Sequence, residues 1–375
     1  AVSAMPTLVK LLGDPDPIVV TQAAAAIGMI RRDDGDVSDA DADAYATTVD
    51  PLVKTTVHSD PRARRAAVRA LRAVHSDPKQ LAVLIGGALD DSDPSVVLPA
   101  LQTLADMEDH AVPVLLEALK DPKSRYWAEV AIAEIGPEAA AAVPRLAELV
   151  SEGEPEEKLQ SILALAEIGP AAAAAAPQLI EALGSNERFL KAAAAFALGT
   201  SRAAAADDAL GKAEDDADAF LSTTASWARA KIRPDDAARV EKALDRLQKA
   251  LKTDDPRLRK AALSGLSDLA AGLDVARQQL LDDPDEAVGL SAGAGLVRLR
   301  EAAVEHLRSR LGEAAHRRQA LGVLGAIGPA AKPALPELTA ALADADEACA
   351  TEAAVALAEF GADAAAAVPE LQKFL

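Results

Sequence analysis

A recurring joint, in which an alanine run lies between two helix-breaking residues, constrains the fold of this 375-residue chain most strongly. It reads EIGPEAAAAVPRLAELV at residues 134–150, EIGPAAAAAAPQLIEAL at 167–183, AIGPAAKPALPELTAAL at 326–342 and EFGADAAAAVPELQKFL at 359–375. The first two copies lie 33 residues apart, and so do the last two. A period of this size is typical of stacked repeat arrays.

The chemistry of the joint predicts where helices end and begin. Gly136 can end a helix in a conformation with positive φ, and Pro137 cannot extend that helix. Pro144 suits the first turn of the next helix, where its missing N–H is not needed. Between joints lies Asp-Pro, in which Asp caps a helix and Pro takes its first position. Each unit is therefore a first helix, an Asp-Pro turn, a second helix and a joint.

Apolar residues recur with helical periods and no alternating strand pattern competes, so the sequence predicts an all-α fold. We expect one α-solenoid over 1–375, a superhelix of stacked antiparallel helix pairs with about eleven repeats. The units are expected to begin near Met5, Tyr45, Lys79, Ala111, Val143, Ala176, Asp208, Val240, Val275, Val304 and Leu335. The unit from Asp208 is the weakest, because it lacks both Asp-Pro and Gly-Pro.

These turns resemble HEAT repeats, especially the bacterial HEAT-like repeats of the phycobilisome-lyase type. The family pattern has Asp at the turn, then Pro, a branched apolar residue three positions on, Arg four on and Ala seven on. The best matches are Asp255, Pro256, Leu258, Arg259 and Ala262, then Asp60 with Arg64 and Asp121 with Arg125. Asp93 and Asp283 lack the basic residue, so a ladder of Asp and Arg is expected to be broken. The resemblance implies a HEAT/armadillo-like solenoid and supplies no catalytic residue.

Both ends of the sequence cut the pattern inside a unit. Ala1 aligns with a joint, and Leu375 aligns with the end of a first helix. Either the chain is a segment of a longer array or single helices cap it. We expect a segment, since VPELQKFL lacks the polar face of a cap.

Composition and charge exclude several classes of function. The formal net charge is −20, which opposes binding to nucleic acid. Only nine residues are aromatic, which disfavours a deep ligand pocket. The single cysteine, Cys349, cannot form an internal disulfide, which fits the cytoplasm, although an exported bacterial compartment stays open. No membrane insertion is expected, and the Ala-, Arg- and Asp-rich usage resembles that of a GC-rich bacterium.

An Asp-rich insertion at 33–50 lengthens the first joint, and it is predicted to be a loop. Asp39, Asp41, Asp43 and Asp50 stand at positions 1, 3, 5 and 12 of an EF-hand-like count, a spacing that suits Ca²⁺. Against calcium, Ala44 replaces the turn glycine and Asp50 the bidentate Glu. The alternative is a solvated loop whose Asp residues cap the next helix.

Candidate contact residues lie on the predicted second helices, which line the concave face in this fold. Arginines cluster in PRARRAAVRALRAV, and Arg65, Arg69 and Arg72 are the predicted partner-binding residues. Tyr126 and Trp227 are candidate hot spots if exposed, and core residues otherwise. The alternative for the arginines is a set of intramolecular pairs with turn carboxylates.

The sequence shows no G-x-S-x-G, H-E-x-x-H, C-x-x-C or phosphate-binding glycine motif, and its five histidines are scattered. We therefore predict a non-catalytic scaffold for a protein or extended peptide partner, which could be a subunit of a larger complex. Chromophore handling like that of the phycobilin lyases, and nucleic-acid binding by local basic patches, are the alternatives.

Overall fold

The computed structural model describes residues 2–33, 39–75, 77–269, 293, 296–297, 300–314 and 316–374. It divides into two compact units, Ala1–Ala209 and Leu210–Leu375, each of which is described separately. Within the described residues all regular elements are α- or 3-10 helices, so the predicted all-α class is confirmed.

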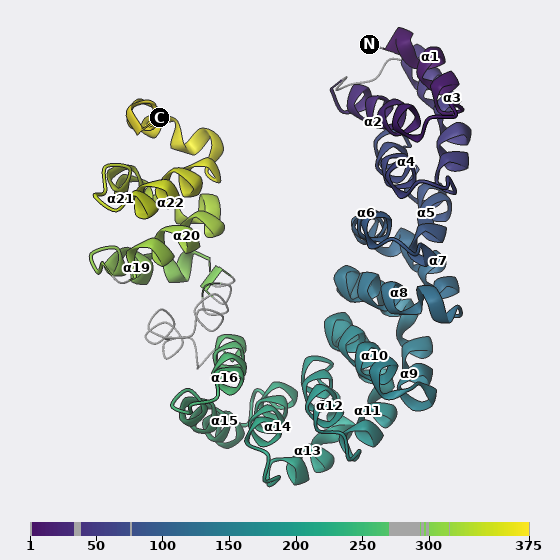
Figure 1. Ribbon diagram of the computed structural model, residues 1–375. Coiled ribbons are helices and arrows are strands. Elements are labelled where there is room, and N and C mark those ends of the chain that lie inside the picture. The colour runs from purple at the N-terminus through teal and green to yellow at the C-terminus, as the bar shows by residue number, and fades with distance from the viewer. Residues whose placement is uncertain are drawn as a thin grey trace. The chain divides into compact units, whose positions relative to one another are not determined.

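The first unit is a stack of helical hairpins (Figure 1). Its first helices, which we call the outer row, are α1 (Met5–Leu11), α3 (Asp39–Thr55), α5 (Pro78–Gly86), α7 (Val112–Ala118), α9 (Val143–Glu152) and α11 (Ala176–Leu183). Its second helices, which we call the inner row, are α2 (Pro17–Asp33), α4 (Pro61–Val74), α6 (Pro94–Ala105), α8 (Pro122–Ile135), α10 (Pro155–Ile168) and α12 (Arg188–Thr200). Each inner helix packs on the next one, and the inner row lies on the concave side of this stack.

The second unit repeats the same plan. First helices are α15 (Ala237–Ala250), α19 (Glu301–Arg310), α21 (Leu335–Ala341) and α23 (Val368–Phe374), and second helices are α14 (Ala219–Ile232), α16 (Pro256–Asp268), α20 (Arg317–Ile327) and α22 (Glu347–Ala358). Helix α13 (Asp207–Ala213) precedes α14 and crosses the boundary between the units. The α-solenoid architecture is thus confirmed. The repeat expected near Val275 lies outside the described residues, and a single array of eleven repeats stays a prediction.

The Gly joints have the predicted geometry. Positive φ angles occur at all four joint glycines: 70° at Gly136, 71° at Gly169, 65° at Gly328 and 53° at Gly361. Residues with a Cβ rarely adopt such angles. Each begins a seven-residue 3-10 helix, for example Gly136–Ala142, that leads into the next first helix. Pro144 lies in the first turn of α9, as expected. The interrupted alanine runs are therefore the connections between hairpins.

The Asp-Pro turns also behave as predicted. Asp60, Asp93, Asp121 and Asp255 each accept a hydrogen bond from the main-chain N–H two residues on, and Pro follows at the first helical position. The seventh residue after each of these capping Asp residues is a fully buried alanine: Ala67, Ala100, Ala128 and Ala262, respectively. A methyl group at this point lets neighbouring helices approach closely.

The Asp-rich segment is a helix where a loop was predicted. Helix α3 begins at Asp39 and continues to Thr55, so it contains all four proposed calcium ligands. A rise of about 1.5 Å per residue separates Asp39 from Asp50 by roughly 16 Å along the axis, whereas Ca²⁺ ligands lie within about 2.6 Å of the ion. The loop prediction is wrong for 39–50, and these residues do not form an EF-hand-like site. The five residues 34–38 lie outside the described part.

One described stretch, Pro155–Leu183, has the length and mean hydropathy (1.4) of a membrane span. In the structure it consists of two helices, α10 and α11, joined by the 3-10 helix Gly169–Ala175. Its most apolar window is 56% buried within the protein. Its hydrophobicity is therefore accounted for by packing between hairpins.

Helix α20 approaches α22 so closely that Gly325 has no room for a side chain. A Cβ at this position would lie 2.7 Å from both Cα and Cβ of Ala356. We expect Gly325→Ala to lower the free energy of unfolding of the second unit by about 1–3 kcal/mol, because the helices must separate. Circular dichroism at 222 nm during thermal unfolding would measure this. Gly312→Ala is the control, since a Cβ there would lie 3.8 Å from its nearest neighbour, the Ser309 carbonyl oxygen. Equal melting temperatures of the two variants would contradict the expectation.

Candidate partner-binding surface

The shared N-cap gives the inner helices a common register, so equivalent surface positions can be compared. Counting from the capping Asp, the fifth residue is Arg65 on α4, Leu98 on α6 and Tyr126 on α8. Leu98 is 54% exposed and Tyr126 is 53% exposed. Large side chains therefore project from the same position of three consecutive inner helices.

Further along the inner row, Leu163 on α10 is 38% exposed and Phe189 at the start of α12 is 68% exposed. Scattered apolar residues on a surface need no explanation, but one large exposed apolar residue on each of four successive inner helices marks a candidate binding surface. Together with Leu98 and Tyr126 they form what we call the inner-row apolar series.

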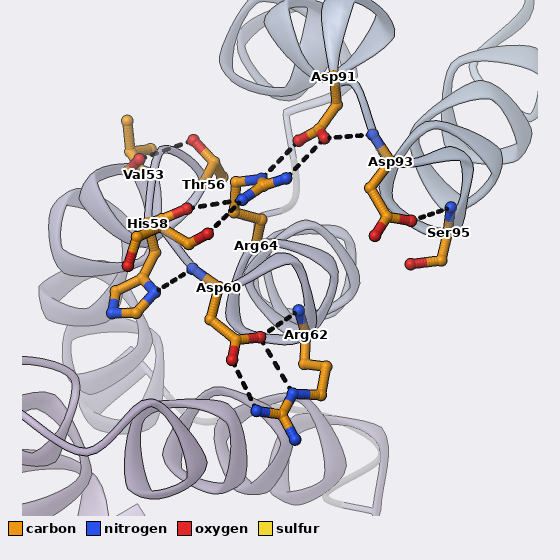
Figure 2. Close-up of polar contacts among 10 residues, drawn as sticks. Val53, Thr56, His58, Asp60, Arg62, Arg64, Asp91, Asp93 and Ser95 are labelled. Atoms are coloured by element: carbon orange, nitrogen blue, oxygen red, sulfur yellow. Dashed lines mark hydrogen bonds and ion pairs between the residues drawn. The ribbon is translucent and has the colours of Figure 1, made fainter.

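Arg64 on α4 is fully engaged within the protein (Figure 2). Its Nε and Nη2 donate to the Asp91 carboxylate at 2.6 and 2.7 Å, and its Nη1 donates to the His58 carbonyl oxygen at 2.8 Å. These hydrogen bonds lower the pKa of Asp91 and raise that of Arg64. The side chain thus joins the turn of its own hairpin to the turn of the next one.

Two other arginines, each four residues after the acidic residue of its turn, also connect neighbouring hairpins. Arg125 donates to the Leu119 carbonyl oxygen at 3.0 Å and to Glu157 of the next hairpin at 2.6 Å. Arg317 donates to the Leu311 carbonyl oxygen and to Asp344, both at 2.7 Å. The expected ladder exists, and Val97, four residues after Asp93, interrupts it.

The acidic partners in this ladder were not identified from the sequence. Asp91 and Asp344 lie two residues before the capping Asp and also accept its N–H, each at 2.9 Å. His58 takes the equivalent position and accepts the Asp60 N–H through Nδ1 at 3.0 Å. In the sequence these acceptors could have been found as the patterns D-x-D and H-x-D directly before a second helix. The hydrogen bond that His58 accepts gives this histidine a structural role.

The remaining arginines of α4 fall into two groups. Arg62 pairs with Asp60, whose pKa it lowers to about 2, and Arg72 pairs with Asp106. Both arginines therefore form intramolecular pairs, which was the alternative given for this cluster, and partner binding by Arg72 stays a prediction. Arg65 and Arg69 have no carboxylate partner among the described residues. Arg65 is half-buried and Arg69 is exposed.

The two aromatic candidates differ. Tyr126 is exposed and makes an edge-to-face contact with Trp127, with ring centroids 5.1 Å apart. Trp227 is 3% exposed on α14, a helix buried on every side between Leu221 and Ala228, so it cannot contact a partner. The prediction for Trp227 is wrong, and its core alternative holds. The helix is enclosed because α15 and α16 both pack against it.

Buried polar clusters were missed altogether by the sequence reasoning. Glu129 on α8 is 1% exposed and accepts a hydrogen bond from Ser161 on α10 at 2.5 Å. Burial raises the pKa of Glu129 to about 7. In the second unit, Glu214 is 4% exposed and accepts from Arg229 at 2.8 Å and Lys242 at 2.5 Å.

Sites for chemistry are not evident where the structure can be described. No group of three or more His, Cys, Asp or Glu side chains in the described ranges could hold a metal. The side chains of Asp39 and Asp41 lie outside that description, and Asp43 and Asp50 are both exposed on α3. Cys349 is 3% exposed, and burial, with Asp346 nearby, raises the pKa of its thiol. That environment disfavours the reactive thiolate.

The hairpin stacks, their capped turns and their arginine ladder define the protein class as an α-solenoid. A family model for HEAT repeats matches residues 40–105 and 112–199. Residues 40–105 and 112–199 of this chain are therefore HEAT repeats. The closer likeness to phycobilisome-lyase repeats stays an expectation.

Two solved structures resemble the chain. A crystal structure of a Kap121p mutant matches with a TM-score of 0.41 and 14% identity, and one of Kap121p matches with 0.40 and 13%. Each match covers 99% of this chain and 46% of the other, so the chain spans about half the length of these relatives. No curated protein matches the chain.

Proposed function

We propose that this protein is a non-catalytic scaffold that binds a protein or extended peptide through the inner row of its first unit. The observation that carries the proposal is the inner-row apolar series, which presents Leu98, Tyr126, Leu163 and Phe189 from four consecutive second helices. The HEAT-repeat match supports a role in protein interaction. A stack of parallel helices offers a long surface across which one partner can make repeated contacts.

The side chains of the series favour a protein partner. Aromatic and large aliphatic groups contribute most binding energy when a partner covers them. Trp127 makes an edge-to-face contact with Tyr126, which restricts the tyrosine ring before a partner binds. The ladder from Arg64 and Arg125 to the following hairpins holds successive helices in register.

The experiment compares inner-row and outer-row variants as bait. Leu98→Ser with Tyr126→Ser removes two members of the series, and Val83→Ser on α5, at a site 68% exposed on the outer row, is the matched control. Partners are captured by crosslinking from an extract of the native source and identified by mass spectrometry. We expect the double variant to lose at least one partner that both the wild type and the control retain, with unchanged thermal unfolding. Identical partner sets for all three proteins would refute the proposal.

A further inference from the structure

We infer that the ligand of the inner row is an extended acidic segment with large apolar residues on one side, and that Arg65 and Arg69 bind its carboxylates. This inference rests on the proposed function and specifies the partner's chemistry. The chain as a whole has a net charge of −20, whereas α4 of the inner row carries five arginines.

Of the five arginines on α4, three have carboxylate partners within the protein, namely Arg62, Arg64 and Arg72. Arg65 and Arg69 remain, one helical turn apart, and residues at this spacing lie about 6 Å from each other on one helix face. That separation suits two carboxylates of one ligand. Neither arginine has a partner in the part of the chain that the structure describes.

The neighbouring inner helices do not neutralise this pair. Helix α6 contains no charged residue, and residues 17–30 of α2 contain none either. Both helices pack against α4. The two guanidinium groups therefore lie between uncharged stretches of α2 and α6, and within residues 17–30 and 94–105 an anionic ligand meets no competing carboxylate.

Beyond the arginines the same register continues with apolar side chains, Leu98 on α6 and Tyr126 on α8. Packed helices lie roughly 10 Å apart, and an extended chain advances about 3.3 Å per residue. A ligand crossing the row therefore moves about three residues per helix. The geometry favours acidic residues over α4, a large apolar residue about three positions away over α6, and an aromatic or aliphatic one about six positions away over α8.

The test is selection from a random peptide library displayed on phage, with the whole protein as bait. Wild-type protein is expected to enrich peptides with an acidic pair and apolar residues about three and six positions from it, in either chain direction. Arg65→Glu with Arg69→Glu should lose them. Lys10→Glu with Lys54→Glu, on the outer helices α1 and α3, changes the net charge equally and should select the same peptides as wild type.

Fluorescence polarisation with the most enriched peptide then gives the affinity. We expect about a tenfold or greater weakening in the Arg65/Arg69 variant, weakening by added salt, and no change in the control. Enrichment of non-acidic peptides, or equal affinity in the two charge variants, overturns the inference. A labelled single-stranded oligonucleotide that binds wild type and is lost in the Arg65/Arg69 variant would overturn it in favour of nucleic acid.

The two proposals fail in distinguishable ways. If Leu98→Ser with Tyr126→Ser abolishes partner capture while the arginine variant binds normally, the scaffold stands and the acidic ligand falls. If neither variant changes any binding, the inner row is not the binding surface and both proposals fall.

Discussion

Glu214→Ala is expected to destabilise the second unit by about 3 kcal/mol, since it removes the buried carboxylate to which Arg229 and Lys242 both donate hydrogen bonds. Glu214 lies just after α13 and is 4% exposed. Arg229 of α14 and Lys242 of α15 both donate to its Oε2. Burial raises the pKa of this carboxyl, but the two cations outweigh burial, so the pKa is lowered overall and the group is ionised.

The cluster stabilises the hairpin that has the weakest repeat signals. Its turn lacks Asp-Pro, although Asp218 still caps α14 by accepting the Phe220 N–H at 2.8 Å. Arg246 of α15 adds a hydrogen bond to the Glu214 carbonyl oxygen at 2.6 Å. The side chain and the main chain of Glu214 thus both bind α15, the first helix of the following hairpin. In other units the Gly-Pro joint positions the following hairpin, and this unit lacks that joint.

Urea unfolding measures the effect, followed by tryptophan fluorescence in a Trp127→Phe background. Trp227 is then the only tryptophan, and it lies in the second unit. Glu241→Ala on α15 is the control, because Glu241 is exposed, and surface changes of this kind stay within about 0.5 kcal/mol. Glu214→Gln keeps an acceptor without the charge and should fall between them. A loss below about 1 kcal/mol for Glu214→Ala would show that the cluster does not hold the hairpin.

The stability of the first unit is expected to fall as the pH rises from about 4.5 to about 7, through Glu129. The pKa of this carboxyl is raised from 4.5 to about 7, chiefly by burial, while the Ser161 hydrogen bond acts in the opposite direction. Below pH 4.5 the folded and unfolded states are both protonated. Between the two pKa values the unfolded state loses its proton first, so ionisation favours unfolding, and above pH 7 the contribution is constant.

A shift from 4.5 to about 7 corresponds to a contribution of roughly 3 kcal/mol, at about 1.36 kcal/mol per pKa unit. Glu129→Gln cannot ionise and keeps an acceptor for Ser161. We expect this variant to lose the decline between pH 4.5 and 7 and to be more stable than wild type at pH 8.

Thermal and urea unfolding at pH 4.5, 6, 7 and 8 would measure the difference, using Trp127 fluorescence in a Trp227→Phe background. Trp127 lies on α8, the helix that carries Glu129. Glu134→Gln, an exposed change on the same helix, is the control and should keep the wild-type pH dependence. The same slope in Glu129→Gln and wild type would rule out Glu129 as its source.

The candidate surface could be predicted from the sequence only in part. The helical register placed Arg65, Arg69 and Tyr126 on the second helices, because the Asp-Pro turn fixes the first position of each of them. Burial of Trp227 could not be foreseen, since it depends on how α15 and α16 enclose α14. The pairing of Arg72 with Asp106 also depends on the distance between neighbouring hairpins, which local pattern does not specify.

Local backbone chemistry in the sequence was sufficient for the repeat: Asp caps, prolines in first turns and glycines with positive φ determine where helices start and stop. Their 33-residue period then determined the solenoid class. The tertiary structure alone decided which charges are used internally, because a buried carboxylate such as Glu129 or Glu214 is indistinguishable in sequence from the many solvated ones. A buried carboxylate differs from a solvated one in two ways: it has lost its contact with water, and it has a hydrogen-bond donor from another hairpin. Both differences arise only when the hairpins stack.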